Sequence, residues 1–288
     1  MTGKLRPYRA WTPFLFLAPG ALVLGVFILA SMVQVIRVSF TSATVFTDGE
    51  FVGLENYQRL LADKVFWLCV GNSFLYLLVT PVVMALSLAA AMLVHAGLRW
   101  AWGLRVWLFF PVVTPTIVAA IAWRLLLDEN DGVLNAAMGT VSIGPVYWLT
   151  EKPFTLVSAM LVTTWKGFGY FMMIFLAGLM AIPKELEEAA SIDGAGRFGV
   201  FWNVVMPGLK PMLVLVALVS SVSALKVFDE LFVTLQGVPV SHQTAVPLIF
   251  DAAFVQGEFG LACAMGVMLF VVVLVFSLVQ LRLSGDGR

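Results

Sequence analysis

The chain has 288 residues, of which 61% are hydrophobic and 12% charged, and its 17 basic and 17 acidic residues give a formal net charge of zero. A soluble domain carries about 25% charged residues, so this composition indicates a protein that lies in lipid. The balanced charge gives no support to nucleic-acid binding. The chain has two histidines, His95 and His242, and two cysteines, Cys69 and Cys263, all far apart. We therefore expect no metal site and no disulfide.

The first apolar stretch runs from Trp11 to Ile36 and follows three basic residues. A cleaved signal peptide has an apolar region of only about 7–15 residues, which is shorter than this stretch. We therefore expect a short cytoplasmic tail at 1–10 and an uncleaved transmembrane helix at 11–36.

Five further apolar runs are long enough to cross a bilayer, since a helical span needs about 20 apolar residues. Unpaired backbone groups are not tolerated in lipid, so each run is expected to be a helix. The runs cover 66–94, 104–127, 154–181, 212–235 and 259–281. The sequence thus predicts an all-α polytopic membrane protein with six transmembrane helices, one membrane core at 66–281 and a cytoplasmic tail at 282–288.

The distribution of lysine and arginine predicts the orientation. With the N-terminus inside, ten basic residues lie in cytoplasmic segments and five in external segments or their flanks. Cytoplasmic segments are the more basic ones, so both termini are expected in the cytoplasm. The external loop at 37–65 is expected to contain a turn and then a short amphipathic helix around Tyr57.

The segment at 182–211 is the most polar part of the cytoplasmic side. Pro183 suits the first turn of a helix, and the glutamates that follow it favour a helix N-terminus. Asp193 and Gly194 are expected to end this helix. A second short helix is expected at 198–205, ended by Pro207. The prediction is a helix-turn-helix at the membrane face.

This segment resembles the EAA loop of ABC importer permeases. The matching residues are Glu188-Ala189-Ala190, Gly194 and Val204-Val205-Met206-Pro207, with Val204 and Met206 as mild departures. The longer string from Ile182 to Ala195 resembles the sugar and glycerol-phosphate branch of these permeases, and further similarities extend over 66–281. The resemblance implies a core of the type I ABC importer permease.

The resemblance implies that the loop docks as a coupling helix on a separate ATPase subunit. The coupling residues would be Glu188, Ala189, Ala190, Asp193, Gly194, Phe198 and Pro207. It also implies a second homologous permease subunit, two ATPase subunits, an external solute-binding protein and a bacterial inner-membrane location. The chain has no phosphate-binding loop motif, so ATP is expected to bind the partner subunits. No catalytic residue and no cofactor of the chain itself are predicted.

Polar residues inside the predicted spans suggest a path for the solute. The stretch from Trp165 to Tyr170 resembles the one in which maltose-permease-like members offer a backbone glycine and a tyrosine to sugar. The predicted path residues are Trp165, Gly167, Tyr170, Ser220, Ser223 and Lys226. Ala224 and Val227 depart from that family pattern, which has polar amide side chains there.

Other interpretations of these residues remain open. Trp165 and Tyr170 could anchor or pack their helix, and the two serines could serve close helix packing. Lys166 and Lys226 could bind an anionic solute such as glycerol 3-phosphate, pair with Asp229 or Glu230, or extend to the membrane surface. An ion-driven secondary transporter is the alternative class, although no internal repeat is apparent.

Overall fold

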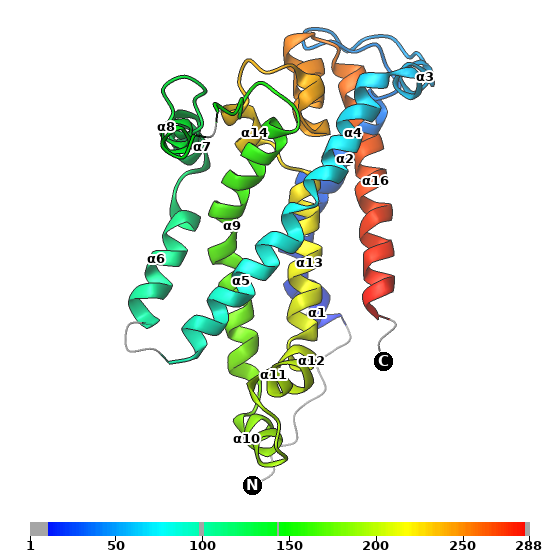
Figure 1. The fold of residues 1–288 in the computed structure, drawn as a ribbon. Coiled ribbons are helices and arrows are strands. Elements are labelled where there is room, and N and C mark those ends of the chain that lie inside the picture. The colour runs from blue at the N-terminus through cyan, green and yellow to red at the C-terminus, as the bar shows by residue number, and fades with distance from the viewer. Residues whose placement is uncertain (1–10, 98–100, 143, 286–288) are drawn as a thin grey trace. The chain divides into compact units, whose positions relative to one another are not determined.

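The computed structural model describes residues 11–97, 101–142 and 144–285, and these form helices and connections with no β-strand among them (Figure 1). Most of the predicted tail residues, 1–10 and 286–288, lie outside the described residues. Four described helices are long and apolar enough to cross a membrane, namely Phe14–Val38, Lys64–His95, Phe154–Ala181 and Phe259–Ser284. The number rises to six if each of two bent helix pairs is one span. These pairs are Trp102–Val113 with Thr116–Leu126, and Arg197–Gly208 with Lys210–Leu225. The all-helical membrane fold is confirmed.

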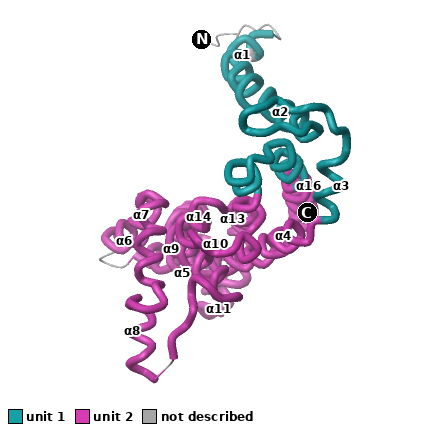
Figure 2. The backbone as a smooth tube through the Cα atoms, turned by 90° about the horizontal axis from the view of Figure 1, so that it is seen from above, with its two compact units in different colours: residues 1–62, 249–268 teal, residues 63–248, 269–288 magenta. Residues whose placement is uncertain are grey.

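The described chain divides into two compact units (Figure 2). The first unit comprises residues 1–62 and 249–268, and the second comprises residues 63–248 and 269–288. Each unit is described by itself.

The first unit begins with a long apolar helix. It consists of α1 (Thr12–Leu24), a π-helical segment η1 (Gly25–Ala30) and α2 (Ser31–Val38). No residue in its most apolar stretch is buried within the structure. Apolar side chains exposed all round a helix of this length are suited to lipid.

The first unit also contains the loop predicted at 37–65, which is held against the start of α16 (Phe259–Gly285). Asn56, on α3 (Glu55–Ala62), donates from its amide to the carbonyls of Ser39 and Thr41, at 2.9 Å each. The amide N–H of Gly260 donates to the Ala43 carbonyl at 2.8 Å. The amphipathic helix that the sequence predicts in this loop is therefore present as α3.

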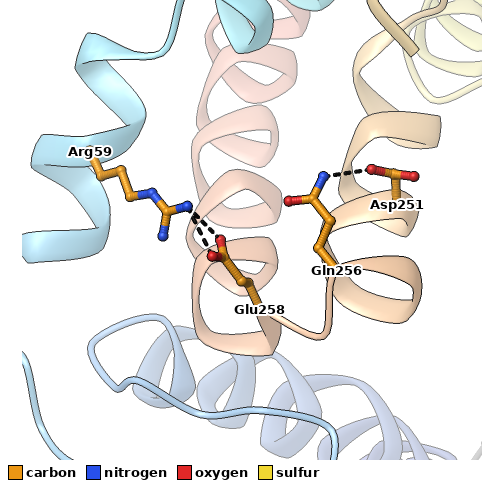
Figure 3. Close-up of polar contacts among 4 residues, drawn as sticks. All are labelled: Arg59, Asp251, Gln256 and Glu258. Atoms are coloured by element: carbon orange, nitrogen blue, oxygen red, sulfur yellow. Dashed lines mark hydrogen bonds and ion pairs between the residues drawn. The ribbon is translucent and has the colours of Figure 1, made fainter. Parts of the chain in front are cut away.

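An ion pair also joins α3 to the residue before α16 (Figure 3). The Arg59 guanidinium, on α3, lies 2.9 Å and 2.8 Å from the two carboxylate oxygens of Glu258, just before α16. Nearby, Gln256 donates to Asp251 at 2.6 Å across the π-helical segment η4 (Asp251–Val255). The pair is partly exposed, so it contributes about 1 kcal/mol or less.

The second unit is built around two helices that pack along each other, α5 (Val79–His95) and α9 (Phe154–Ala181). A cluster of buried residues joins them to α13 (Lys210–Leu225), with Phe175 and Met172 at its centre. Ser87 donates to the Phe168 carbonyl at 2.8 Å and links α5 to α9. The helix α4 (Lys64–Tyr76) precedes α5, and together they form the second span.

The third span is bent, and the predicted single helix at 104–127 is wrong. Helix α6 (Ala101–Val113) and helix α7 (Thr116–Leu126) meet at an angle of 95°. Pro115 has no N–H with which to continue the helix, and a proline disfavours helical geometry in the residue before it, Thr114. Hydropathy records the length of an apolar run and not its direction, so the bend was not predicted.

The fifth span is shorter than predicted, and the continuous helix expected at 212–235 is also wrong. Helix α13 ends at Leu225, and a separate helix α14 (Asp229–Thr234) follows. Asp229 and Glu230 lie in the first turn of α14, where the helix dipole stabilises negative charge. The same charges make a continuous apolar span unfavourable at this point.

Connections at the end of the second unit that contains α8 and α14 are held by side-chain hydrogen bonds. Before α9, the amide of Asn135, on α8 (Val133–Thr140), donates to the carbonyls of Glu129 and Val146 and accepts from the Trp148 ring N–H. After α14 come the short helices η3 (Val240–His242) and α15 (Ala245–Phe250). Asp128 accepts backbone N–H groups of Asp131 and Asn130, which lower its pKa.

Candidate functional site

The first part of the candidate site is the segment at 182–211, between α9 and α13, which is named the coupling segment after the role predicted for it. Helix α10 (Lys184–Ile192) starts after Pro183 and carries Glu185 and Glu187 in its first turn. It ends with Gly194 at φ +87°, while the N–H of Ala195 donates to the Ala190 carbonyl at 2.9 Å. This is the Schellman ending, which needs a left-handed residue after the helix. The predicted start and end of this helix are confirmed.

The second helix of the segment is longer than the sequence predicts. It runs through α11 (Arg197–Val200), the π-helical η2 (Phe201–Val205) and α12 (Met206–Gly208). Pro207 therefore lies within this helix and does not end it, which corrects the prediction. A proline at the start of α12 leaves out an N–H close to the π-helical turns, where the usual hydrogen-bond pattern is already changed. The helix bends by 65° before α13 begins.

The coupling segment presents polar and apolar groups to its surroundings. Glu188, Ala189 and Asp193 are exposed. Ile192 is 85% exposed and Phe198 is 76% exposed, and the Phe198 ring packs edge-on against Trp202 with ring centres 6.0 Å apart. Within the second unit, α10 and α11 lie at the end opposite α8 and α14 (Figure 1). Exposed aromatic groups of this kind suit a protein interface, and the carboxylates beside them can accept charge-assisted hydrogen bonds from a partner.

The second part of the candidate site is a cavity of about 320 Å³ in the second unit. Its walls come from α5, α9, α13, the connection after α13, and α14. The lining residues are Val79, Val83, Thr163, Gly167, Phe171, Ser220, Ser223, Ala224, Lys226, Val227, Phe228, Asp229 and Glu230. Small and hydroxyl side chains thus line one wall, and charged side chains another.

Four of the six predicted path residues line this cavity, namely Gly167, Ser220, Ser223 and Lys226. The Ser220 hydroxyl donates to the Val216 carbonyl of its own helix at 2.6 Å, so it offers a ligand only its oxygen lone pairs. Within the described chain, no partner accepts or donates a hydrogen bond at the Ser223 hydroxyl. Ser223 is therefore the serine with its donor free for a ligand.

The other two predicted path residues, Trp165 and Tyr170, are not among those that line the cavity. Trp165 packs edge-on against Trp123 of α7, with ring centres 5.9 Å apart. Tyr170 is 47% exposed and packs against Phe171, which does line the cavity. Whether any of the six contacts solute stays a prediction.

Comparison with known proteins assigns the family. The sequence profile described as "Binding-protein-dependent transport system inner membrane component" matches residues 66–285. The chain belongs to this family.

Curated relatives align over nearly the whole chain. The trehalose/maltose transport system permease protein MalF of Thermococcus litoralis is 31% identical over 100% of this chain and 98% of the relative. The arabinooligosaccharides transport system permease protein AraP of Bacillus subtilis is 32% identical over 96% of this chain and 89% of the relative. A bacterial ABC transporter that imports the acidic polysaccharide alginate has a chain of the same fold, with a TM-score of 0.84, 18% identity and 96% of both chains covered.

One wall of the cavity carries charged side chains of both signs, from Lys226, Asp229 and Glu230. Lys226 and Asp229 are exposed and Glu230 is partly exposed, and within the described residues no ion pair joins Lys226 to either carboxylate. The pairing interpretation of Lys226 therefore has no support in the structure. One lysine and two carboxylates leave the wall without excess positive charge.

Two further groups of lining residues were not predicted from the sequence. Thr163 lies one helical turn before Gly167, so the spacing of four could have revealed it. Its hydroxyl is 2.7 Å from the hydroxyl of the buried Tyr76. The second group, Val79 and Val83, comes from α5 and has no sequence signal that distinguishes it from ordinary packing. Among the described residues, no group of three or more histidine, cysteine or acidic side chains could hold a metal ion.

Proposed function

We propose that this chain is one of two membrane subunits of an ATP-driven importer, and that it forms half of the path for a sugar or sugar-like solute. The observation that carries the proposal is the full-length similarity to permeases whose names give trehalose/maltose and arabinooligosaccharides as cargo. The cavity supports it, because hydroxyl groups beside apolar side chains match the polar edges and apolar faces of a sugar ring.

The coupling segment explains how ATP hydrolysis elsewhere could move this cavity. The segment joins α9, which carries Gly167, directly to α13, which carries Ser220 and Ser223. A partner that displaces α10 therefore pulls on two walls of the cavity at once. Exposed Phe198 and Glu188 would give such a partner an apolar anchor and a charged hydrogen-bond acceptor.

The proposed assembly contains a second homologous permease, two ATPase subunits and an external solute-binding protein. ATP binds the ATPase subunits, and this chain needs no cofactor and performs no hydrolysis. The second permease would complete the path beside Tyr170, whose exposed ring is next to the cavity residue Phe171. The chain would lie in a bacterial inner membrane with both termini in the cytoplasm.

A second candidate cargo is an anionic polyol such as glycerol 3-phosphate. The observation that favours it is Lys226, an exposed ammonium group in the cavity lining. Asp229 and Glu230 line the same cavity and oppose a negatively charged solute, so we propose a neutral sugar first.

Uptake by the purified importer tests the proposal. The chain would be reconstituted in liposomes with its partner permease, ATPase subunits and binding protein. Maltose, trehalose, arabino-oligosaccharides, diacetylchitobiose and glycerol 3-phosphate would each be offered with and without internal ATP. ATP-dependent uptake of a neutral sugar is the expected result. Uptake of glycerol 3-phosphate alone would favour the second cargo, and uptake driven by an ion gradient without ATP would refute the importer.

A further inference from the structure

The bend of the third span leaves backbone groups that the membrane requires to be paired. Two of the carbonyls at the end of α6 find donors in Thr114 itself. The Thr114 hydroxyl donates to the Phe110 carbonyl at 3.2 Å, and its N–H donates to the Pro111 carbonyl at 3.3 Å. The carbonyl of Thr114 itself lies between α6 and α7, and no backbone N–H of the described residues donates to it.

Lys166 on α9 supplies that donor. Its ammonium group donates to the Thr114 carbonyl at 3.2 Å. The negative end of a helix dipole lies at its C-terminus, so a cation is favoured at this place as well as a hydrogen-bond donor. Lys166 is only partly exposed, which strengthens the interaction compared with one in water.

Residues of α9 next to Lys166 contact both helices of the bend, α6 and α7. Trp165 packs against Trp123 of α7, one residue before Lys166. One turn later, Gly169 lets the backbone of α6 approach so closely that a Cβ there would collide with the Leu108 carbonyl oxygen. The ring of Trp165 thus contacts α7, the ammonium group of Lys166 contacts the break, and the backbone at Gly169 lies against α6.

Helix α7 contacts a helix that lines the cavity. Helix α7 packs against α14, and Arg124 of α7 donates to the side chain and the backbone carbonyl of Gln236 just beyond α14. Helix α14 provides Asp229 and Glu230 to the cavity wall. The bend is therefore connected to this wall of the cavity through α7.

Lys166 itself does not line the cavity, whereas Lys226 does. The charges of Lys166 and Glu230 are close enough to interact, but Glu230 is not its hydrogen-bond partner. The two lysines of the spans thus have different surroundings, although the sequence gives them the same alternatives.

We propose that Lys166 is a positioning residue of the solute path, which holds the bend between α6 and α7, and through it the α14 wall, without contacting the solute. This inference rests on the proposed import function. It assigns the ammonium group of Lys166 to a backbone carbonyl and not to an anionic cargo.

The first test compares Lys166→Met and Lys166→Arg in the complete importer in lipid nanodiscs and liposomes. Hydrogen exchange of the peptide around 106–118 needs no solute, and it should become faster in K166M and return close to the wild-type rate in K166R. With the sugar identified in the uptake test, K166M should lower the maximal uptake rate roughly tenfold, the equivalent of one charge-assisted hydrogen bond. The KM should stay within about twofold.

A double-mutant cycle with Pro115→Ala makes the test specific. Alanine at 115 restores an N–H and relaxes the bend, so K166M should add little to P115A in exchange rate, ATP hydrolysis and uptake. Independent effects of K166M and P115A would overturn the proposal. Unchanged hydrogen exchange in K166M would also overturn it, because Lys166 would then have no role in holding the bend. A rise in KM alone, or a loss of uptake restricted to glycerol 3-phosphate, would overturn it as well, because either result would indicate that Lys166 contacts the solute.

The two proposals fail in different ways. If none of the five solutes is taken up, the proposed sugar function fails, while exchange and basal ATP hydrolysis still decide the role of Lys166. If wild-type uptake is normal and the exchange of K166M is unchanged, the role of Lys166 fails and the import function stands.

Discussion

Gly194 is the residue at which the coupling segment depends most on backbone geometry. Its φ of +87° is a conformation that residues with a Cβ rarely adopt, and no neighbouring atom lies within 4 Å of a Cβ placed there. A larger residue at this position would therefore be strained by its backbone conformation and not by a collision with neighbouring atoms. A left-handed conformation costs an ordinary residue about 1–2 kcal/mol.

The Gly194→Val variant tests this dependence. Valine should distort the end of α10, and we expect uptake and solute-stimulated ATP hydrolysis to fall roughly tenfold, while the amount of protein in the membrane stays the same. Gly196→Val is the matched control, because Gly196 has φ −69° and equal space. Normal coupling in G194V, or an equal loss in G196V, would contradict the assignment.

The two cavity serines should differ in their effect on uptake. Ser223 has its hydroxyl hydrogen free for a ligand, whereas Ser220 donates to Val216. Ser223→Ala should raise the half-saturating solute concentration by roughly 3- to 10-fold, as expected for one lost hydrogen bond to a neutral ligand. Ser220→Ala should change it less. The half-saturating concentrations of the two variants would be measured in the same uptake assay. A larger increase in Ser220→Ala than in Ser223→Ala would contradict the prediction.

Residue-level features were predictable where they depend on neighbours in the sequence. Pro183, Gly194 and the glutamates between them encode a helix and its two ends, so α10 was found from local signals. The cavity depends on which face each span turns inward. Two residues of one stretch of α9 were predicted for the path, yet Gly167 lines the cavity and Tyr170 does not. Periodicity relates residues of one helix but gives no direction relative to its neighbours.

At the scale of elements, the packing of α6 on α9 depends on Gly169. A methyl group at Gly169 would collide with the Leu108 carbonyl oxygen and lie 3.1 Å from a methyl carbon of Val112. Overpacking of this kind costs about 1–3 kcal/mol, which exceeds the roughly 1 kcal/mol that alanine gains over glycine in a helix.

Gly169→Ala should therefore lower the thermal unfolding midpoint of the detergent-solubilised protein by several degrees. Gly266→Ala, on α16, is the control, since no neighbouring atom lies within 4 Å of a Cβ there. That variant should be neutral or slightly stabilised. An unfolding midpoint of G169A at or above that of G266A would refute the close packing.

The element boundaries show what hydropathy can and cannot predict. It located the six long apolar runs, because burial in lipid depends on composition over about 20 residues, and it passed over the shorter apolar helix at Ala245–Val255. It missed the break at Thr114 and the early end of α13 at Leu225. Both lie where a proline or a charge cluster interrupts the backbone pattern, and the residues that follow Leu225 line the cavity. Irregular backbone within a membrane protein is tolerated where protein or a cavity surrounds it: Lys166 contacts the first break, and the second adjoins the cavity.

At the scale of the whole molecule, the connections of the second unit alternate between its two ends. The turn after α5 and the segment α10–α12 share one groove, lined by His95, Glu187 and Arg197 among others. The connections that contain α8 and α14 lie at the opposite end (Figure 1). Each long helix between them therefore crosses the unit once, as a succession of membrane spans requires.

This alternation, together with the distribution of lysine and arginine, leads to the prediction that the α10 end faces the cytoplasm. Alkaline phosphatase is active only outside the cytoplasm, so fusions after residues 55 and 140 should be active and fusions after residues 97 and 195 inactive. A fluorescent-protein reporter at the same four positions should give the inverse pattern. Lysine and arginine flanking the spans determine orientation, and they favour this arrangement by ten to five. Active phosphatase after residue 195 would place α10 outside, where no ATPase subunit could reach it, and would remove the basis for coupling.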